Sequence, residues 1–224
     1  MRAMDNPRDD TGLEHYRTRG AFTIAAVRAD TDTKGMEVAF AAVHTDLKTK
    51  SRESDDLEET LQEYEAVISV RDRSVDKIVR SLELRQLDMV DKNRDDPRYR
   101  RYFPQGLRAV TEADARRVEP ALVRDIVKTL DEDQAKAGFD TLHGEYRDKL
   151  FAAVEAVEAA DAACAQIEAQ LAFLQDKVLA EVKLKWVEER KKLHADLTKM
   201  FPHDEARVES YFLRFAKPRK KKAE

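Results

Sequence analysis

The residues with the clearest potential for binding chemistry lie in a short segment near the middle of the chain. Residues 94–107 read RDDPRYRRYFPQGL, with arginines placed next to aromatic side chains. Guanidinium groups bind phosphates and aromatic rings stack on bases, so this composition suits a single-stranded nucleic acid or another polyanion. It equally suits a plug, in which the rings close one end of a helical bundle while the arginines stay in water. The candidate residues are Arg98, Arg100, Arg101, Tyr102 and Phe103.

The end of the sequence supplies a second candidate surface. A basic tail at residues 217–224 follows an aromatic group, which we expect either to seal the bundle or to dock onto another subunit. The tail can hold an acidic partner, nucleic acid or an anionic membrane surface; its alternative role is that of a solubilising end. The residues of this surface are Tyr211, Phe212, Phe215, Lys217, Arg219, Lys220, Lys221 and Lys222.

Patterns typical of catalysis or metal binding are weak in this sequence. A carboxylate three residues before a histidine occurs once, at Asp140 and His143, where the acid also suits a helix start. No nucleophile elbow or glycine-rich phosphate loop occurs. The single cysteine, Cys164, lies among alanines, which predicts a small core residue. We therefore predict no enzyme activity, no cofactor and no metal site.

Composition points to long helices. Charged residues make up 38% of the chain, while glycine and proline contribute six residues each, as in coiled coils. Because 41 basic residues are interspersed with 45 acidic ones, the whole protein has no strong attraction for polyanions. We found no apolar run long enough for a transmembrane segment and no apolar block typical of a secretory signal. The expected location is cytoplasmic.

The longest predicted helix covers residues 145–200, which contain neither glycine nor proline. As one rod this segment would measure roughly 80 Å. Alanines surround Asp161 in its middle, so either another backbone packs closely there or the rod protrudes beyond its neighbours. The helix can be straight, kinked or folded back at this point. Its apolar stripe comprises Leu150, Val154, Val157, Ile167, Leu171, Leu174, Val178, Val182, Trp186, Leu193, Leu197 and Met200.

An earlier seam runs from Leu57 to Met89 and is interrupted by Arg71 and Arg85, which we expect to lie across it or to fix its register through acidic partners. A turn near residues 51–54 is one interpretation of the polar sequence before this seam, and a continuous helix is the other. Gly20 and Gly35 predict a bend or a tight helix crossing.

These patterns predict an all-α protein: an elongated, antiparallel, coiled-coil-like bundle of about four long helices with a short C-terminal helix. The predicted segments are an N-terminal arm (1–12), a helical hairpin (13–93), a linker (94–110), a second hairpin (111–200), a short helix (203–216) and the tail (217–224). The leading functional hypothesis is a non-enzymatic scaffold acting as a homo-oligomer or through a protein partner. A nucleic-acid or polyanion-binding module that uses Arg98–Arg101 and Lys217–Lys222 is the alternative, and a helical dimer on membranes is the third.

Overall fold

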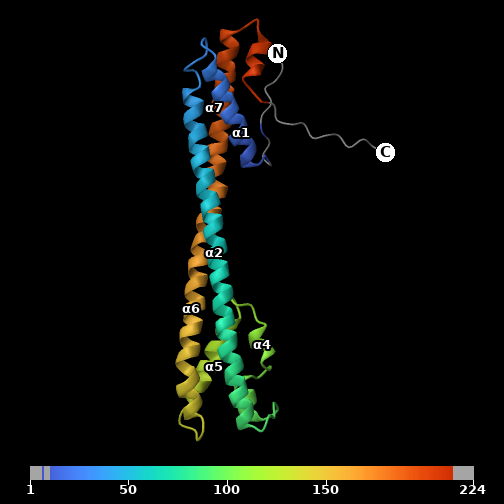
Figure 1. The fold of residues 1–224 in the computed structure, drawn as a ribbon, viewed down its shortest axis with the longest axis vertical. Coiled ribbons are helices and arrows are strands. Elements are labelled where there is room, and N and C mark those ends of the chain that lie inside the picture. Colours follow the sequence, from blue (N-terminus) through green and yellow to red (C-terminus); the bar gives the residue numbers. More distant parts are fainter. Residues whose placement is uncertain (1–6, 8–10, 214–224) are drawn as a thin grey trace, which may run out of the picture. The chain divides into compact units, whose positions relative to one another are not determined.

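The computed structural model describes residues 7 and 11–213 and contains helices and connecting loops (Figure 1). Helices account for 79% of the chain, and none of the described residues forms a β-strand, which confirms the all-α prediction. In chain order the elements are α1 (Leu13–Ala29), α2 (Val38–Met89), α3 (Pro97–Tyr102), α4 (Arg108–Thr111), α5 (Glu119–Asp133), α6 (Asp140–Phe173), the π-helix η1 (Leu174–Leu179), α7 (Ala180–Met200) and α8 (Glu205–Ser210).

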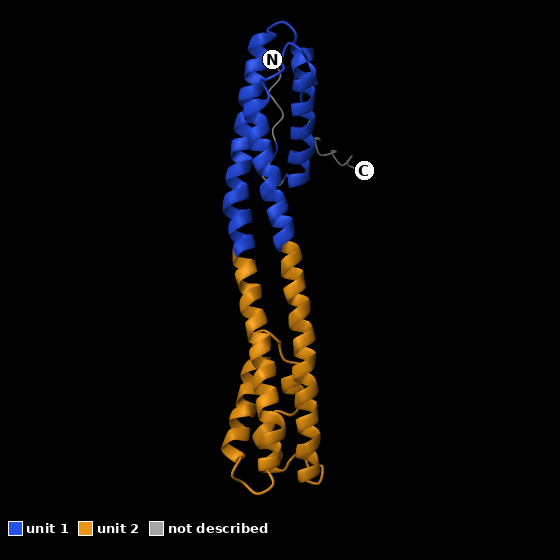
Figure 2. Ribbon diagram, turned by 60° about the vertical axis from the view of Figure 1, so that its left-hand side comes forward, with its two compact units in different colours: residues 1–57, 170–224 blue, residues 58–169 orange. Residues whose placement is uncertain are grey.

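The chain divides into two compact units, coloured separately in Figure 2. Unit 1 comprises Met1–Leu57 and Gln170–Glu224, and unit 2 comprises Glu58–Ala169. Both boundaries fall inside long helices, because α2 passes from unit 1 into unit 2 and α6 returns to unit 1. The predicted linker 94–110 therefore lies within unit 2 and does not connect the two units. The domain boundaries expected from the sequence remain a prediction.

Unit 1 is built on the antiparallel pairing of α2 with η1 and α7. Trp186 Nε1 donates to His44 Nδ1 at 3.3 Å, and Gln175 Nε2 donates to Ser54 Oγ at 3.2 Å. The residue numbers rise along α2 while those of its partner fall, so the two helical segments are antiparallel. Helices α1 and α8 complete a core that consists of Tyr16, Val27, Phe40, Leu47, Val182, Trp186, Leu193, Leu197, Val208, Tyr211 and Phe212.

The glycines of unit 1 have the roles that their positions suggested. At Gly20 in α1, a Cβ atom would lie 2.3 Å from His44 Nδ1, so the absence of a side chain permits the two helices to cross closely. Gly35 has φ of +100° in the turn between α1 and α2, a conformation that favours glycine. One glycine therefore allows a tight crossing and the other a bend.

The long helical segment 140–200 is continuous in secondary structure, but η1 changes its register. The predicted stripe passed from Leu174 to Val178, whereas the buried residues are Leu174 and Leu179. A π-helix has a wider turn and accommodates this step of five residues. After it, Val182 and Trp186 return to ordinary helical spacing in the core.

Unit 2 pairs the remainder of α2 with α6, again in antiparallel directions. Ser81 Oγ lies 2.9 Å from the Tyr146 hydroxyl, and the Arg71 guanidinium donates to the backbone carbonyl of Ala156. Arg85 lies beside Glu145, at 3.6 Å between Nη2 and Oε2. Both seam arginines therefore bridge to the facing helix. The main core consists of Val75, Val79, Leu82, Leu87, Val90, Tyr99, Tyr102, Phe103, Val110, Val123, Ile126, Val127, Leu130, Phe139, Leu142, Tyr146, Leu150, Val154 and Val157.

The alanine-rich part of α6 packs closely against α2. Ala160 and Cys164 are buried against Ile68, which confirms Cys164 as a small core residue. Burial raises the pKa of its thiol. Asp161 does not face an apolar partner, because its carboxylate accepts from the guanidinium of Arg116.

Several helix boundaries occur where the sequence has a proline or a capping side chain, and none occurs at the polar stretch 51–54. Helix α5 begins at Glu119 with Pro120 in its first turn, Asp204 Oδ1 accepts from the Arg207 amide at the start of α8, and α7 ends at Met200, directly before Phe201. By contrast, α2 continues through residues 51–54, so the interpretation as a turn was wrong there and the continuous helix is the structure. No glycine or proline interrupts that stretch, and Ser51 and Ser54 are buried.

Candidate functional site

The arginine and aromatic segment forms a short helical cap on unit 2. Asp96 begins α3, since its Oδ1 accepts from the Arg98 amide at 2.8 Å, and Pro97 follows at the first helical position. The side chain of Arg98 also binds Asp96 and, together with this amide, lowers the pKa of that carboxyl. The sequence DDPR therefore starts the helix that places the next aromatic residues.

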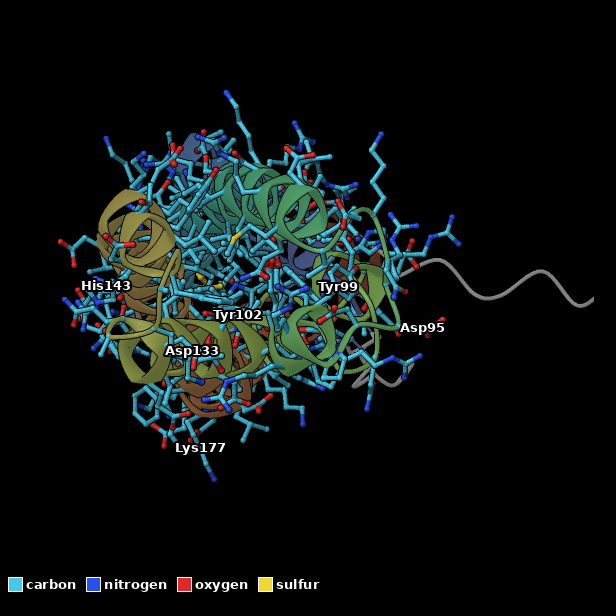
Figure 3. The ribbon with its side chains drawn as sticks, turned by 90° about the horizontal axis from the view of Figure 1, so that it is seen from below. Asp95, Tyr99, Tyr102, Asp133, His143 and Lys177 are labelled. Carbon is cyan, nitrogen blue, oxygen red and sulfur yellow. The ribbon has the colours of Figure 1, made fainter. Side chains whose placement is uncertain are left out.

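Two tyrosines of α3 attach the cap to buried carboxylates on other helices. The Tyr99 hydroxyl donates to Glu83 of α2 at 2.9 Å, and the Tyr102 hydroxyl donates to Asp133 of α5 at 3.3 Å. Figure 3 labels both tyrosines and Asp133, and Asp133 lies near Tyr102 in this view. Burial raises the pKa of each tyrosine, so both keep the proton that they donate. We call this arrangement the tyrosine clamp.

Each carboxylate of the tyrosine clamp also binds an arginine. Arg94 Nη2 donates to Glu83 at 3.1 Å, and Arg101 Nε donates to Asp133 at 3.1 Å. Glu83 and Asp133 are only 3% and 1% exposed, so these pairs help to neutralise buried charges, and Lys136 is a further partner of Asp133. The clamp is thus a closed polar network, fixed from α2 and α5.

The predicted binding residues of this segment separate into two groups. Tyr102 and Phe103 are buried in the core, as a plug requires. Arg98, Arg100 and Arg101 are partly exposed, and they bind Asp96, Asp95 and Glu132 respectively, with Asp133 as a further partner of Arg101. A polyanion at these arginines would have to displace carboxylates that already hold them.

Beside the cap lies an open groove of about 660 Å³, which we call the arginine groove. Its lining residues are Arg94, Asp95, Tyr99, Arg100, Phe103, Pro104, Gln105, Gly106, Leu107 and Arg108. Of its arginines, only Arg100 was a predicted binding residue. Arg94 begins the segment 94–107 and Arg108 directly follows it; both were missed, although these positions beside the aromatic residues were visible in the sequence.

The predicted aromatic group near the C-terminus contributes to the core of unit 1. Tyr211 and Phe212 are buried, and the Tyr211 hydroxyl donates to Asp30 at 2.5 Å. Arg207 binds the same carboxylate, and the two donors lower the pKa of Asp30 to about 2. Helix α8 is thereby attached to the turn after α1. Phe215, Lys217, Arg219, Lys220, Lys221 and Lys222 lie outside the described residues.

Sequence reasoning missed several buried ionisable side chains, among them His44 and Glu119. His44 is 4% exposed in the core of unit 1, and Glu119 is 2% exposed in unit 2 beside Asp72 and Asp76. In the described structure, Glu119 Oε1 and Asp76 Oδ1 have no hydrogen-bond partner. Helical periodicity alone gives no signal for such residues, because their neighbours come from other helices.

Arg190 is a further buried charge in unit 1. Its guanidinium lies 5.1 Å from the ring centre of Phe212 and 5.8 Å from that of Trp186, a geometry that permits cation–π attraction. Trp186, which was predicted to lie in the core, is thus also a partner of the charged Arg190 side chain.

Searches of the described part of the chain found no cluster of histidine, cysteine or acidic side chains arranged to hold a metal ion, and no helix with the length and apolarity needed to cross a membrane. Comparisons with protein-family models, curated proteins and solved structures found no match.

Proposed function

We propose that the protein is a cytoplasmic, non-enzymatic scaffold with coiled-coil-like helices that self-associates or binds a protein partner. The observation that supports the proposal is the exposure of large apolar side chains on the outer face of unit 1. Phe173 is 64% exposed and Leu184 is 72% exposed, although both lie on the helical segment that also supplies the core.

Two further exposed residues lie between them on the same helical segment. Phe173, Lys177, Ala180 and Leu184 are all exposed and follow one another at spacings of four, three and four across the π-helix η1. Figure 3 shows the Lys177 side chain projecting away from the helices. We call these residues the outer stripe. It is distinct from the buried residues Leu174, Leu179, Val182 and Trp186.

An exposed stripe of this kind supports association for an energetic reason. Burying a phenylalanine or leucine side chain in an interface contributes about 1.5–3 kcal/mol. Lys177 can extend its aliphatic part along the same surface while its amine stays in water. The outer stripe therefore offers a helix surface to a second helix.

Light scattering coupled to size exclusion, repeated over a concentration range, tests the proposal. We expect a discrete oligomer for the full chain and a shift toward monomer for the double variant Phe173→Ser and Leu184→Ser. A matched control is Val70→Ser with Leu84→Ser, because both residues are 61% exposed but lie on α2 in unit 2. A strict monomer at every concentration, or equal effects of both double variants, would contradict self-association through the outer stripe.

A further inference from the structure

The arginine groove has an excess of basic side chains in its lining. Arg94, Arg100 and Arg108 contribute guanidinium groups, and Asp95 is the acidic residue among the lining residues. The groove belongs entirely to unit 2, so it is separate from the outer stripe. Its volume of about 660 Å³ lies within the range of small-molecule sites.

Arg94 is held in place from beneath the groove. Its Nη2 donates to Glu83, which is 3% exposed and also accepts from the Tyr99 hydroxyl. The Arg94 side chain nevertheless remains 67% exposed. The tyrosine clamp therefore positions one guanidinium at the groove before any ligand arrives, which reduces the entropy lost on binding.

Arg100 and Arg108 have partners that an anion can replace. The Asp95 partner of Arg100 has a side chain that is 81% exposed. Arg108 is 88% exposed, and its Nε lies 3.7 Å from Glu112 Oε1. Such exposed pairs contribute little to stability, so a ligand with more charge can compete for these guanidinium groups.

We propose that the arginine groove binds the phosphate group of a small phosphorylated ligand. The planar guanidinium fork matches phosphate oxygens with paired N–H donors, and arginines from both ends of the segment border the same space. This binding site goes beyond the proposed scaffold role and does not depend on it.

The buried rings favour a small ligand over a nucleic-acid strand, although both carry phosphates. Tyr99 and Phe103 line the groove but are only 2% and 1% exposed, so their faces are not free to stack on bases. Base stacking on exposed aromatic rings is a main contribution to single-strand binding. The groove thus retains the phosphate chemistry of the predicted polyanion site without its stacking surface.

Titration calorimetry of the full chain with inorganic pyrophosphate tests this proposal at low salt. We expect saturable binding at one site, weakened at least about tenfold in the double variant Arg100→Ala and Arg108→Ala. The matched control is Arg73→Ala, which removes an exposed arginine of the same unit from α2, outside the groove. Circular dichroism confirms that each variant keeps its helix content.

Three results would overturn the proposal. The first is the absence of saturable pyrophosphate binding up to about 10 mM, and the second is an equal loss of binding in the Arg73 control, which would indicate only general charge attraction. The third is that a ten-nucleotide oligodeoxythymidine binds the wild-type groove more than about tenfold more tightly than pyrophosphate and loses this affinity in the double variant, which would identify a strand as the ligand.

Discussion

Unit 1 and unit 2 each contain a buried ionisable side chain that burial keeps uncharged, and the two are of opposite chemical type: His44 is a base and Glu119 is an acid. In unit 1, burial lowers the pKa of His44 to about 4, with a smaller effect from Lys48. In unit 2, burial raises the pKa of Glu119 to about 9, and Asp72 and Asp76 reinforce the shift. A low-dielectric environment favours the neutral form of both, so the same physical cause moves a base and an acid in opposite directions.

The two pKa shifts make the free energy of unfolding depend on pH in opposite directions. The folded pKa of His44 lies below its ordinary value of 6.5, so its contribution is complete above that pH and is lost as the pH falls toward 4. The folded pKa of Glu119 lies above its ordinary value of 4.5, so its contribution is complete below that pH and is lost as the pH rises toward 9. His44 thus contributes acid sensitivity to unit 1, and Glu119 contributes base sensitivity to unit 2.

The largest expected effect comes from filling the helix crossing in unit 1. In Gly20→Ala the new Cβ would meet His44 Nδ1 at 2.3 Å, so the ring must move and its hydrogen bond from Trp186 is lost. We expect a destabilisation of about 3 kcal/mol. Denaturant unfolding followed by fluorescence of Trp186, the single tryptophan, measures it in unit 1.

The matched control for that variant is Gly144→Ala in α6 of unit 2. Nothing lies within 4 Å of a Cβ at Gly144, so alanine should stabilise the helix by up to about 1 kcal/mol. Destabilisation by Gly144→Ala, or no effect of Gly20→Ala, would show that the crossing is not the cause.

Glu119→Gln tests whether Glu119 causes the loss of stability at high pH in unit 2. The amide cannot ionise, so the variant should gain about 2 kcal/mol over wild type near pH 8 and lose the decline in stability between about pH 5 and 9. Urea unfolding followed by circular dichroism at a series of pH values measures the difference. Glu59→Gln, which alters an exposed residue of α2 in the same unit, should leave the decline unchanged. Persistence of the decline in Glu119→Gln would assign it to other groups.

The tyrosine clamp gives a smaller effect within unit 2. Tyr99→Phe and Tyr102→Phe each remove a hydroxyl donor from a buried carboxylate, at a cost of about 1–2 kcal/mol. Hydrogen exchange of residues 97–103 should increase more than that of α6. Tyr64→Phe, which alters a partly buried tyrosine elsewhere in unit 2, is the control. Unchanged exchange in both clamp variants would contradict the role of the hydroxyls.

His44→Gln should have the smallest effect and confine it to acid pH. Between pH 7.5 and pH 5, the free energy of unfolding should fall by about 1 kcal/mol less in the variant than in wild type, because glutamine takes no proton. Trp186 fluorescence follows the transition. His143→Gln in unit 2 should not reproduce the change in Trp186 fluorescence. A variant with the acid sensitivity of wild type would exclude His44 as its source.

The sequence predicted those features that depend on near neighbours along the chain. Pro120, Asp204 and Gly35 mark helix ends and turns through backbone conformation and local hydrogen bonds, and they were found. The π-helix η1 was not, because it replaces Val178 by Leu179 in the core without any local interruption of the apolar pattern.

The candidate sites depended on residues distant in sequence and were predicted only in part. The segment containing Arg100 and Tyr102 was visible from its composition, but the carboxylates of Glu83 and Asp133 come from other helices. Periodicity identifies which face of a helix is buried and does not identify which side chain of another helix meets it. The exposure of Phe173 and Leu184 was likewise not predicted.

Hydrogen exchange measured by mass spectrometry tests the opposite pH dependence of the two units most directly. Protection in the full chain, corrected for intrinsic exchange rates, is compared at about pH 5 and pH 8.5 for wild type, His44→Gln and Glu119→Gln. The account predicts that peptides of α7 are less protected at the lower pH and peptides of α5 at the higher pH, each dependence disappearing in its own variant. The same pH profile in both units, or profiles unchanged by the two substitutions, would contradict it.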